Sequence, residues 1–513
     1  MFRRLNRILV VAVSIIFLLS AFPARHIKAN ELGMLSQENN QGEKLKGLLP
    51  IDFPPQRQNL TAFEKAQNQF PLPSAYNHDI SNPLYQTPVK DQQKTDLCWA
   101  FAPMAAIESS TLKNMGSITD FSEAHVACAL SYDSGNKFGF DRPLSGRGWS
   151  HSVISYLMRG SLQGVINESE CPMGEELVPE NALSETKDKN ASFTVPNAYM
   201  ITSDSFNFSR DANKIKQAVM NYGAVTSYMV ISDEFFYGAN DDSHAYFFDG
   251  DVNIRGGSHY GHTIVIVGWD DNYSKDNFPA QYTRPKHAQV NPNQTYSITQ
   301  PINNGAWLIK NSWGNDWFGY DGYAWISYED RFIGYCSFAY APAVNFVPDK
   351  KVYEYDTFGY CGYISSWDYG MNVFSAAGAD EILKEVKVFA PVGGENIKIY
   401  AIPDYDNAQS FNLNEMVLAA ELNAVDSYGA AYIGYYTIPI KEPISVGSKF
   451  AIVVKYNNGF IPVEKLIKGY TSLAAAYPGQ SYVFNENGAD LTDISATEKQ
   501  NICVKAVTSK TAD

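Results

Sequence analysis

The hydrophobic and polar positions divide the chain into four stretches. Residues 1–29 hold a basic segment followed by a continuous apolar run, and residues 30–70 are polar and rich in Asn and Gln. Residues 71–343 mix helical and strand-like periodicities, whereas residues 350–510 consist of short alternating runs separated by turn signals. The pattern therefore predicts a leader, a region of mixed α and β structure, and an all-β region.

The first stretch has the layout of a secretory signal peptide. Basic residues precede the apolar run Ile8–Phe22, which is shorter than the roughly 20 residues that a membrane-spanning helix needs. We expect cleavage after Ala29, with Ala24 as the alternative site and an uncleaved anchor as the alternative interpretation. Because no later run approaches membrane length, we expect a secreted or extracellular protein with no membrane contact after signal cleavage. Residues 30–70 are interpreted as a prosegment or leader.

The all-β region, 350–510, is predicted to be a β-sandwich. Its runs alternate apolar and polar residues and are separated by turns such as Gly393-Gly394 and Asn458-Gly459. Short strands at this spacing, with few helical stretches, are typical of a sandwich. The predicted strands are Leu383–Phe389, Asn396–Ile402, Tyr432–Ile440, Lys449–Tyr456, Ser481–Phe484 and Asn501–Val507.

Composition and charge exclude several classes of protein. With 513 residues the chain is too long for one core, and 40 basic against 55 acidic residues give a net charge of −15. That charge argues against nucleic-acid binding through phosphate contacts, and six cysteines are too few for a disulfide scaffold. Asp404, Asp406 and Glu415 match three positions of a calcium loop, but Gln409 stands where that loop needs glycine. We therefore predict no metal site and no cofactor.

Cys98 begins the clearest helical pattern of the chain, which extends to about Met115 and is followed by Gly116. At the first turn of a helix, unpaired backbone N–H groups and the macrodipole stabilise a thiolate, which is the nucleophilic form. Gln92 lies in the loop that enters this helix. Its side-chain amide and the backbone N–H of Cys98 would together form an oxyanion hole. The alternative is a buried, inert thiol.

Two later segments carry side chains that complement a cysteine. His262 precedes the apolar run Thr263–Val267 and is expected at the mouth of a buried strand, while Asn311 and Trp313 follow the run Ala306–Lys310. An Asn oxygen that accepts from imidazole Nδ1–H would leave Nε2 for the sulfur, and the indole would shield that hydrogen bond. Taken singly, a core histidine and a turn asparagine are the alternatives.

The segments TPVKDQ…CWAF, GHTIVIVGW and LIKNSWGNDWFGYDGY resemble the papain-like cysteine peptidases over roughly residues 72–343. The resemblance implies an α+β fold in which a two-lobed catalytic domain, with a helical lobe and a β-barrel-like lobe, precedes the all-β sandwich. It implies Cys98 as nucleophile, His262 as general base and then acid, and Asn311 as its orienter. It also implies Gln92 in the oxyanion hole and protein or peptide substrates bound in extended form.

Gly146-Arg147-Gly148 resembles, imperfectly, the glycine stretch that pairs with the substrate backbone in these peptidases. Gly148 is therefore predicted to bind substrate, with Arg147 as an intrusion, although a plain glycine turn is the alternative. Trp313 is likewise predicted to lie at the substrate site.

The chain departs from the family pattern at several points. Thr95–Leu97 occupy the positions of a cysteine, a glycine and a serine, so one disulfide of the family is absent and Asp96 puts a negative charge beside the cleft. Pro103 lies inside the predicted helix, where proline costs about 3 kcal/mol or more. The Cys–His and Cys–Asn spacings exceed the family's roughly 130–150 residues. His259 is a competing base, and we prefer His262 because the apolar run follows it directly.

The remaining cysteines allow two disulfides by position, Cys128–Cys171 and Cys361–Cys503. The motifs GYYTIPI, KFAIVVKYN and GQSYVFNENG make residues 350–510 similar to the lectin-like module of some secreted bacterial papain-like enzymes, which implies a glycan or cell-surface ligand. Two other functions stay open. One is an adhesion or carbohydrate-binding protein that uses the papain-like fold as a scaffold, and the other is a related Cys–His acyltransferase.

Overall fold

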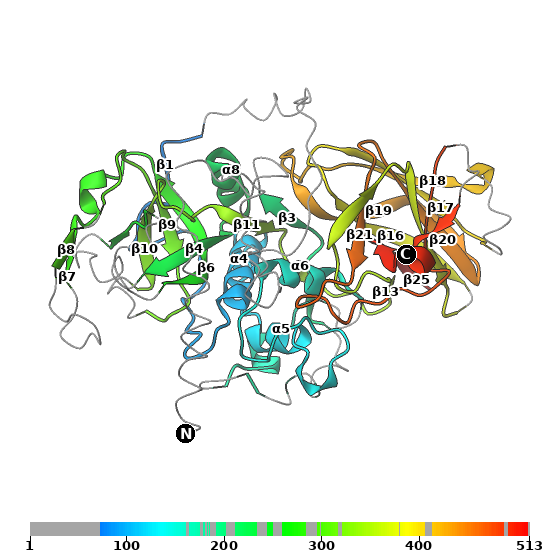
Figure 1. Cartoon of the computed structure of the whole chain (residues 1–513), viewed down its shortest axis with the longest axis horizontal. Coiled ribbons are helices and arrows are strands. Elements are labelled where there is room, and N and C mark those ends of the chain that lie inside the picture. Colours follow the sequence, from blue (N-terminus) through cyan, green and yellow to red (C-terminus); the bar gives the residue numbers. More distant parts are fainter. Residues whose placement is uncertain are drawn as a thin grey trace, which may run out of the picture.

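The computed structural model describes residues 72–510, apart from gaps at 161–163, 175–177, 180–181, 183, 185–190, 202–210, 233–243, 250–258, 284–294, 298, 316–320, 379, 406–412 and 487–490. The predicted signal peptide and prosegment lie outside the described residues. None of the described helices is long and apolar enough to cross a membrane. Helices fill the middle of the molecule, a strand-rich lobe lies on one side of them and an all-β domain on the other (Figure 1). The predicted α+β class is confirmed.

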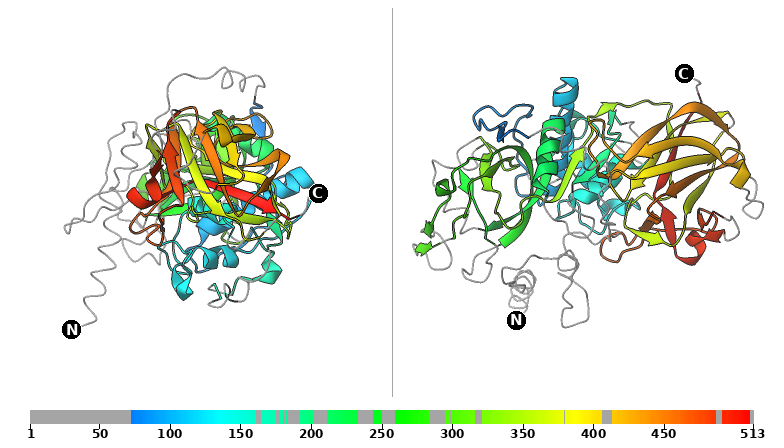
Figure 2. Two further views of the ribbon diagram at one scale, coloured as in Figure 1. Left: turned by 90° about the vertical axis from the view of Figure 1, so that its right-hand side faces the viewer. Right: turned by 90° about the horizontal axis from the view of Figure 1, so that it is seen from above.

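The helical lobe is built around α4 (Cys98–Met115), most of whose residues are buried. Gly116 ends α4 with φ +69°, and its N–H bonds to the Leu112 carbonyl, as expected for a glycine at this position. The helix packs against α5 (Glu123–Ala129), α6 (Ser150–Met158) and α8 (Ala212–Tyr222), and Figure 2 shows α4 and α8 side by side. Short helical turns lie at Asp133–Gly135, Glu168–Glu170, Lys275–Asn277, Leu413–Glu415 and Ile494–Thr497.

Pro103 lies inside α4 without interrupting it. A proline here cannot donate to the carbonyl of Trp99, four residues earlier in the helix. That carbonyl instead accepts a hydrogen bond from Ser150 Oγ at 3.3 Å. The first residue of α6 thus supplies the donor that the proline removes, which is the compensation that the sequence alone does not reveal.

The strand-rich lobe holds β6, which begins at His259 rather than at His262 and pairs on both sides within the sheet. Its neighbour β4 places Met229 opposite His262, and β9 pairs with the second half of β6. The strands of this lobe are β1 (Ala75–Tyr76), β3 (Ala198–Ile201), β4 (Val225–Ser232), β5 (Ala245–Tyr246), β6 (His259–Asp270), β9 (Ala306–Lys310), β10 (Tyr323–Ser327) and β11 (Tyr335–Tyr340). Two small ladders join β2 (Phe193–Thr194) to β12 (Val344–Asn345) and β7 (Gln281–Thr283) to β8 (Thr295–Ser297).

The C-terminal domain is the predicted sandwich. A six-stranded sheet, in the order β18-β17-β20-β15-β22-β23, shares a core with the strands β13, β25, β16 and β19. Ile399 and Val454 from the first sheet and Val388 and Ala506 from the second lie in that core. The strands are β13 (Lys351–Tyr353), β14 (Gly362–Ser365), β15 (Tyr369–Ser375), β16 (Glu381–Ala390), β17 (Asn396–Ile402), β18 (Val417–Asn423), β19 (Ile433–Val446), β20 (Lys449–Tyr456), β21 (Phe460–Lys465), β22 (Ser481–Phe484), β23 (Thr492–Asp493), β24 (Gln500–Ile502) and β25 (Val504–Ser509).

One sheet runs through both domains, a feature that the sequence did not predict. Strand β19 of the sandwich pairs antiparallel with β3 of the catalytic region, with Gly434 opposite Tyr199, so the two sheets join into one of twelve strands. Gly434 has φ +152°, and a Cβ atom there would lie 2.2 Å from the Ala198 carbonyl oxygen. Only glycine therefore permits the close approach of backbones at this junction.

Neither of the two candidate disulfides is formed. Cys361 and Cys503 flank β21, because the Cys361 N–H donates to the Val463 carbonyl and the Cys503 N–H donates to the Pro462 carbonyl. Two strand spacings, about 9.5 Å, separate the two backbones. A disulfide requires Cα atoms within about 7 Å, so this pair cannot be bridged without moving the strand between them.

Candidate active site

Cys98 is the first residue of α4 and is half-buried. The Thr263 backbone N–H and hydroxyl, together with the Trp99 backbone N–H, interact with its sulfur and favour the thiolate. Burial and the nearby Asp96 carboxylate outweigh these donors and raise the pKa of the thiol above its usual 9. The donor at the helix start therefore does not offset burial, and the pKa of Cys98 is raised overall, contrary to what its position in the sequence suggested.

His262 is buried in β6, at 3% exposure, and its Nε2 atom lies 2.7 Å from Asn311 Oδ1. The Trp313 ring covers the imidazole, with ring centroids 4.6 Å apart. Burial lowers the pKa of His262 to about 4, and the bond to Asn311 acts in the opposite direction. The imidazole is therefore neutral near pH 7 as long as no thiolate forms beside it.

The ring nitrogens of His262 have the reverse roles from those expected. We predicted that Asn311 would bind Nδ1 and leave Nε2 for the sulfur, but Asn311 Oδ1 bonds to Nε2. The same oxygen accepts from the Ser312 backbone N–H at 2.8 Å, so it acts as an acceptor and Nε2 as the donor. Nδ1 is then the nitrogen that carries the lone pair. It lies on the side of the ring nearer the main chain, where the next residue, Thr263, contacts the sulfur of Cys98.

Gln92 is buried and its side-chain amide is held at both ends. Its Oε1 accepts from Ser312 Oγ at 2.7 Å, and its Nε2 donates to the Thr95 carbonyl at 2.8 Å. Its backbone N–H donates to the Ser312 carbonyl at 2.8 Å. An amide nitrogen carries two hydrogens, so one N–H of Gln92 is left to donate to a bound oxygen.

Gly148 lies against Trp99, the residue that follows Cys98. A Cβ atom at Gly148 would be 2.6 Å from the indole, so only glycine fits in this position. The indole Nε1 donates to the Gly146 carbonyl at 3.2 Å, and Arg147 projects outward, with Nε 3.5 Å from Asp96. The structure thus brings all six predicted residues into one region: Gln92, Cys98, Gly148, His262, Asn311 and Trp313.

A partly buried ion cluster anchors the loop that carries Gln92. Lys90 Nζ lies 2.9 Å from Glu108, 2.6 Å from Asp120 and 2.9 Å from Glu123. The three carboxylates raise the pKa of Lys90, and burial raises the pKa of Glu123 to about 8. The cluster ties the loop to α4 and to the start of α5, which fixes the distance between Gln92 and the helix.

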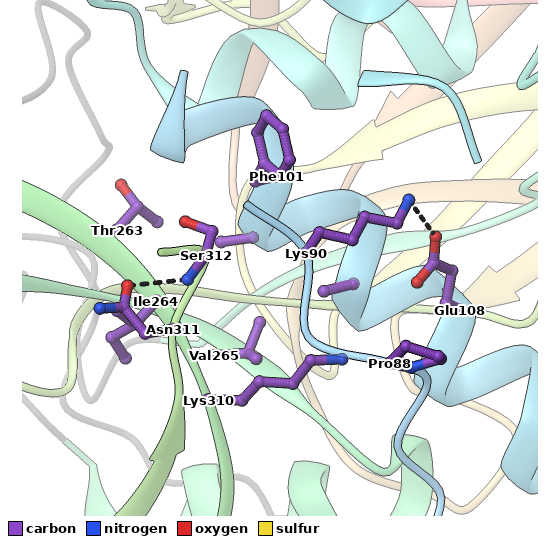
Figure 3. Close-up of a pocket in the computed structure, with 12 residues that line it drawn as sticks. Pro88, Lys90, Phe101, Glu108, Thr263, Ile264, Val265, Lys310, Asn311 and Ser312 are labelled. Atoms are coloured by element: carbon purple, nitrogen blue, oxygen red, sulfur yellow. Dashed lines mark hydrogen bonds and ion pairs between the residues drawn. The ribbon is translucent and has the colours of Figure 1, made fainter. Parts of the chain in front are cut away.

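A small cavity lies behind these residues, between α4, β6 and β9 (Figure 3). Its volume is about 20 Å³, whereas one water molecule needs roughly 10–15 Å³ and a ligand pocket several hundred. Lys310 and Glu108 line it, and Lys310 Nζ donates to the Thr87 carbonyl at 2.7 Å. The cavity is large enough for a water molecule but too small for a peptide, so it is not the place where substrate binds.

Three contributors to the site were missed from the sequence. Thr263 follows His262, Ser312 follows Asn311, and Glu108 interrupts the otherwise apolar or small buried residues of α4. A carboxylate among buried helix positions requires a cationic partner, and this signal could have identified Glu108 and, through it, Lys90. The calcium-loop residues Asp406 and Gln409 lie outside the described residues. Within the described part of the chain, no three His, Cys, Asp or Glu side chains cluster to hold a metal.

Residues 74–345 match the papain family of cysteine proteases, and residues 352–508 match the family described as lectin like domain. The chain therefore belongs to the papain family of cysteine proteases and is a papain-like cysteine peptidase with a C-terminal lectin-like domain.

Two solved structures are similar to most of the chain. The clostridial cysteine protease Cwp84 after propeptide cleavage is 27% identical, with a TM-score of 0.67, and the match covers 86% of this chain and all of that one. A structure of the cysteine protease and lectin-like domains of Cwp84, a surface-layer-associated protein of Clostridium difficile, is 25% identical with the same TM-score, over 90% of this chain and 91% of that one.

Curated relatives match only part of the chain. Cathepsin J of Mus musculus is 25% identical over 301 residues, which are 55% of this chain and 74% of the relative. Digestive cysteine proteinase 3 of Homarus americanus is 22% identical over 256 residues, 50% of this chain and 62% of that relative.

Proposed function

We propose that this protein is a secreted endopeptidase in which Cys98 is the nucleophile, His262 the general base and then acid, and Asn311 the residue that orients the imidazole. The observation that carries the proposal is the bond from His262 Nε2 to Asn311, which leaves Nδ1 to accept the proton of Cys98. The contact of Thr263 with the sulfur supports it, because Thr263 is bonded to His262 in the chain.

The reaction is acyl transfer in two halves. The proton of Cys98 Sγ moves to His262 Nδ1 as the sulfur attacks the carbonyl carbon of the scissile peptide bond, giving a tetrahedral oxyanion. The C–N bond breaks, the imidazolium protonates the leaving amine, and a thioester remains on Cys98. Water then attacks the thioester with His262 as base, and the released thiolate regains its proton from the imidazolium.

The burial of both groups favours this coupled proton transfer. A thiolate alone or an imidazolium alone is disfavoured, because burial raises the pKa of Cys98 and lowers that of His262. Opposite charges formed together attract each other at close range in a low-dielectric site, so the two groups titrate as a pair. The indole of Trp313 over the imidazole keeps water from the bond that holds the ring.

Gln92 and the backbone N–H of Cys98 form the oxyanion hole of this proposal, and Ser312 sets the orientation of the Gln92 amide. Replacing Gln92 by alanine is expected to lower kcat by about 10²–10³-fold, because one oxyanion donor is removed. Ser312→Ala removes the hydrogen-bond partner of Gln92 Oε1 but keeps the Gln92 amide as a donor. Its kcat should therefore lie between those of the wild type and Gln92→Ala. Steady-state kinetics on a peptide substrate, with thermal unfolding as a check of the fold, measure both. An unchanged kcat in Gln92→Ala would remove this residue from the mechanism.

The remaining parts of the proposal concern location and ligands. We infer that residues 1–29 direct export, that residues 30–70 restrain the enzyme until they are removed, and that the catalytic and lectin-like domains extend over 71–343 and 350–510. Similarity to a surface-layer-associated relative supports a location outside the cell. Proteins or peptides are the substrates, bound beside Gly148 and Trp313, and the lectin-like domain takes a glycan or another cell-surface ligand.

Labelling with an epoxide that alkylates activated thiolates, followed by casein digestion, tests this function. We expect the label on Cys98, which is half-buried, and not on the buried thiols Cys361 and Cys503. We also expect casein to be cleaved and the cleavage to stop once Cys98 is labelled. Labelling without casein cleavage would favour an acyltransferase. The absence of labelling would favour an adhesion scaffold.

A further inference from the structure

The wall segment, defined here as residues 141–149, lies beside the start of α4 and contains Gly148. It has no regular helix or strand, so backbone ladders do not determine its shape. Its conformation therefore depends on contacts with the segments around it. The preceding part of the helical lobe holds its first half, because the Tyr132 backbone N–H donates to the Arg142 carbonyl at 3.2 Å and the Leu144 backbone N–H donates to the Asp133 carboxylate at 2.6 Å. Two further sides pack against the segment.

The first side is α4 and the loop before it. The Asp96 backbone N–H donates to the Ser145 carbonyl at 3.2 Å, and Trp99 holds the Gly146 carbonyl through its indole N–H. The buried Arg142 guanidinium lies over the Trp99 ring, 4.3 Å from its centroid, and donates to the Leu144 carbonyl at 2.7 Å. These contacts tie the wall segment to the residue next to Cys98.

The second side is the lectin-like domain, through the segment after β21, which lies beside α6 (Figure 1). Tyr470 is fully buried there. Its ring packs perpendicular to the ring of Trp149, at 4.8 Å, and its carbonyl accepts from the Asp141 backbone N–H at 2.9 Å. Its hydroxyl lies 2.8 Å from His151 Nδ1, in the first turn of α6. Tyr470 thus contacts both ends of the wall segment and the helix that follows it.

A second contact closes the same junction at the surface. Ser472 Oγ lies 2.5 Å from the Asp141 carboxylate, and its backbone N–H donates to that carboxylate at 3.3 Å. The lectin-like domain therefore hydrogen-bonds to the first residue of the wall segment, Asp141, from both Tyr470 and Ser472.

We infer that Tyr470 of the lectin-like domain is a positioning residue for peptide binding, because it holds the wall segment, and with it Gly148, in place against Trp99, the residue next to Cys98. This inference rests on the proposed peptidase function. Loss of the Tyr470 contacts loosens the part of the site that binds the substrate backbone but leaves the donors around Cys98 and His262 intact. The expected signature is a change in KM with little change in kcat or in thiol reactivity.

The test compares Tyr470→Ala, Ser472→Ala and the control Tyr428→Phe in the full chain. Tyr428 also belongs to the lectin-like domain and bonds to the catalytic region, but at Asn114 near the far end of α4. We expect Tyr470→Ala to raise KM for an extended peptide about tenfold and Ser472→Ala to raise it a few-fold, from the usual strengths of a ring contact and a hydrogen bond. Alkylation of Cys98 by iodoacetamide, which does not need the wall segment, should keep its rate.

Each outcome decides one question. If wild type cleaves the peptide but neither variant changes KM, the inference is wrong and the proposed function stands. An equal rise in KM for Tyr428→Phe would also overturn it, because the effect would then belong to the whole interface. If Tyr470→Ala does not fold, as judged by thermal unfolding, Ser472→Ala decides alone. A wild type that cleaves no peptide contradicts the proposed function itself.

Discussion

Replacing Cys98 by alanine is expected to lower kcat/KM for peptide hydrolysis by about 10⁴-fold or more, because the thioester intermediate cannot form. The fold should be retained. Cys98 is half-buried at the start of α4 and its side chain is small, so its removal leaves little empty space. Cleavage of a peptide substrate, followed with matched amounts of folded protein, measures the loss.

Cys503→Ala provides the matched control. It removes another fully buried thiol, which interacts with Asp356 and Lys505 of the lectin-like domain, and it should leave kcat/KM within a factor of about two of the wild type because no interaction with the substrate is removed. Residual hydrolysis near the wild-type level in the Cys98 variant would mean that another group performs the chemistry.

Replacing His262 by alanine is expected to abolish hydrolysis to a similar extent and to change how the reactivity of Cys98 depends on pH. Without its proton acceptor, the half-buried thiol keeps its raised pKa, so very little of it is thiolate at pH 7. Its alkylation rate should then fall about 100-fold at pH 7 and recover only in alkaline solution.

The wild type should behave differently on the acid side. Above about pH 4 the imidazole of His262 is neutral and can take the thiol proton, whereas below this pH it is already protonated and cannot. The alkylation rate of wild-type Cys98 should therefore be nearly level from pH 8 down to about 5 and fall towards pH 4. His125→Gln is the control, because His125 is also buried with a pKa lowered to about 4 but bonds to Tyr156. A His262 variant that is alkylated at the wild-type rate at pH 7 would contradict the pairing.

The sequence predicted residues that the structure brings into one region, but it did not predict which of their atoms meet. Cys98 at a helix start and His262 in a strand are local features, so short stretches of sequence carry them. Which imidazole nitrogen meets Asn311 depends on the direction from which β9 approaches β6, and this is a property of the assembled sheet. The same limit explains the pKa of Cys98, which is set by burial among residues far apart in the chain.

The fold class was likewise predictable, because helical and alternating patterns mark the two domains. The joining of those domains was not. The pairing of β19 with β3 connects Gly434 and Tyr199, which are 235 residues apart in the sequence (434 − 199). No local sequence pattern links the two positions. The hydrogen bond by which Ser150 replaces the donor that Pro103 lacks could not be predicted for the same reason, because Ser150 belongs to another helix.

The ladder between β19 and β3 also determines the geometry of any reaction on a tethered target. Rotation of one domain against the other would break main-chain hydrogen bonds, so the lectin-like domain cannot swing like a module on a linker. A molecule held by that domain therefore stays at a constant distance and bearing from Cys98. Cleavage of a target bound in this way would be restricted to the peptide bonds that lie at that fixed distance from the lectin-like domain.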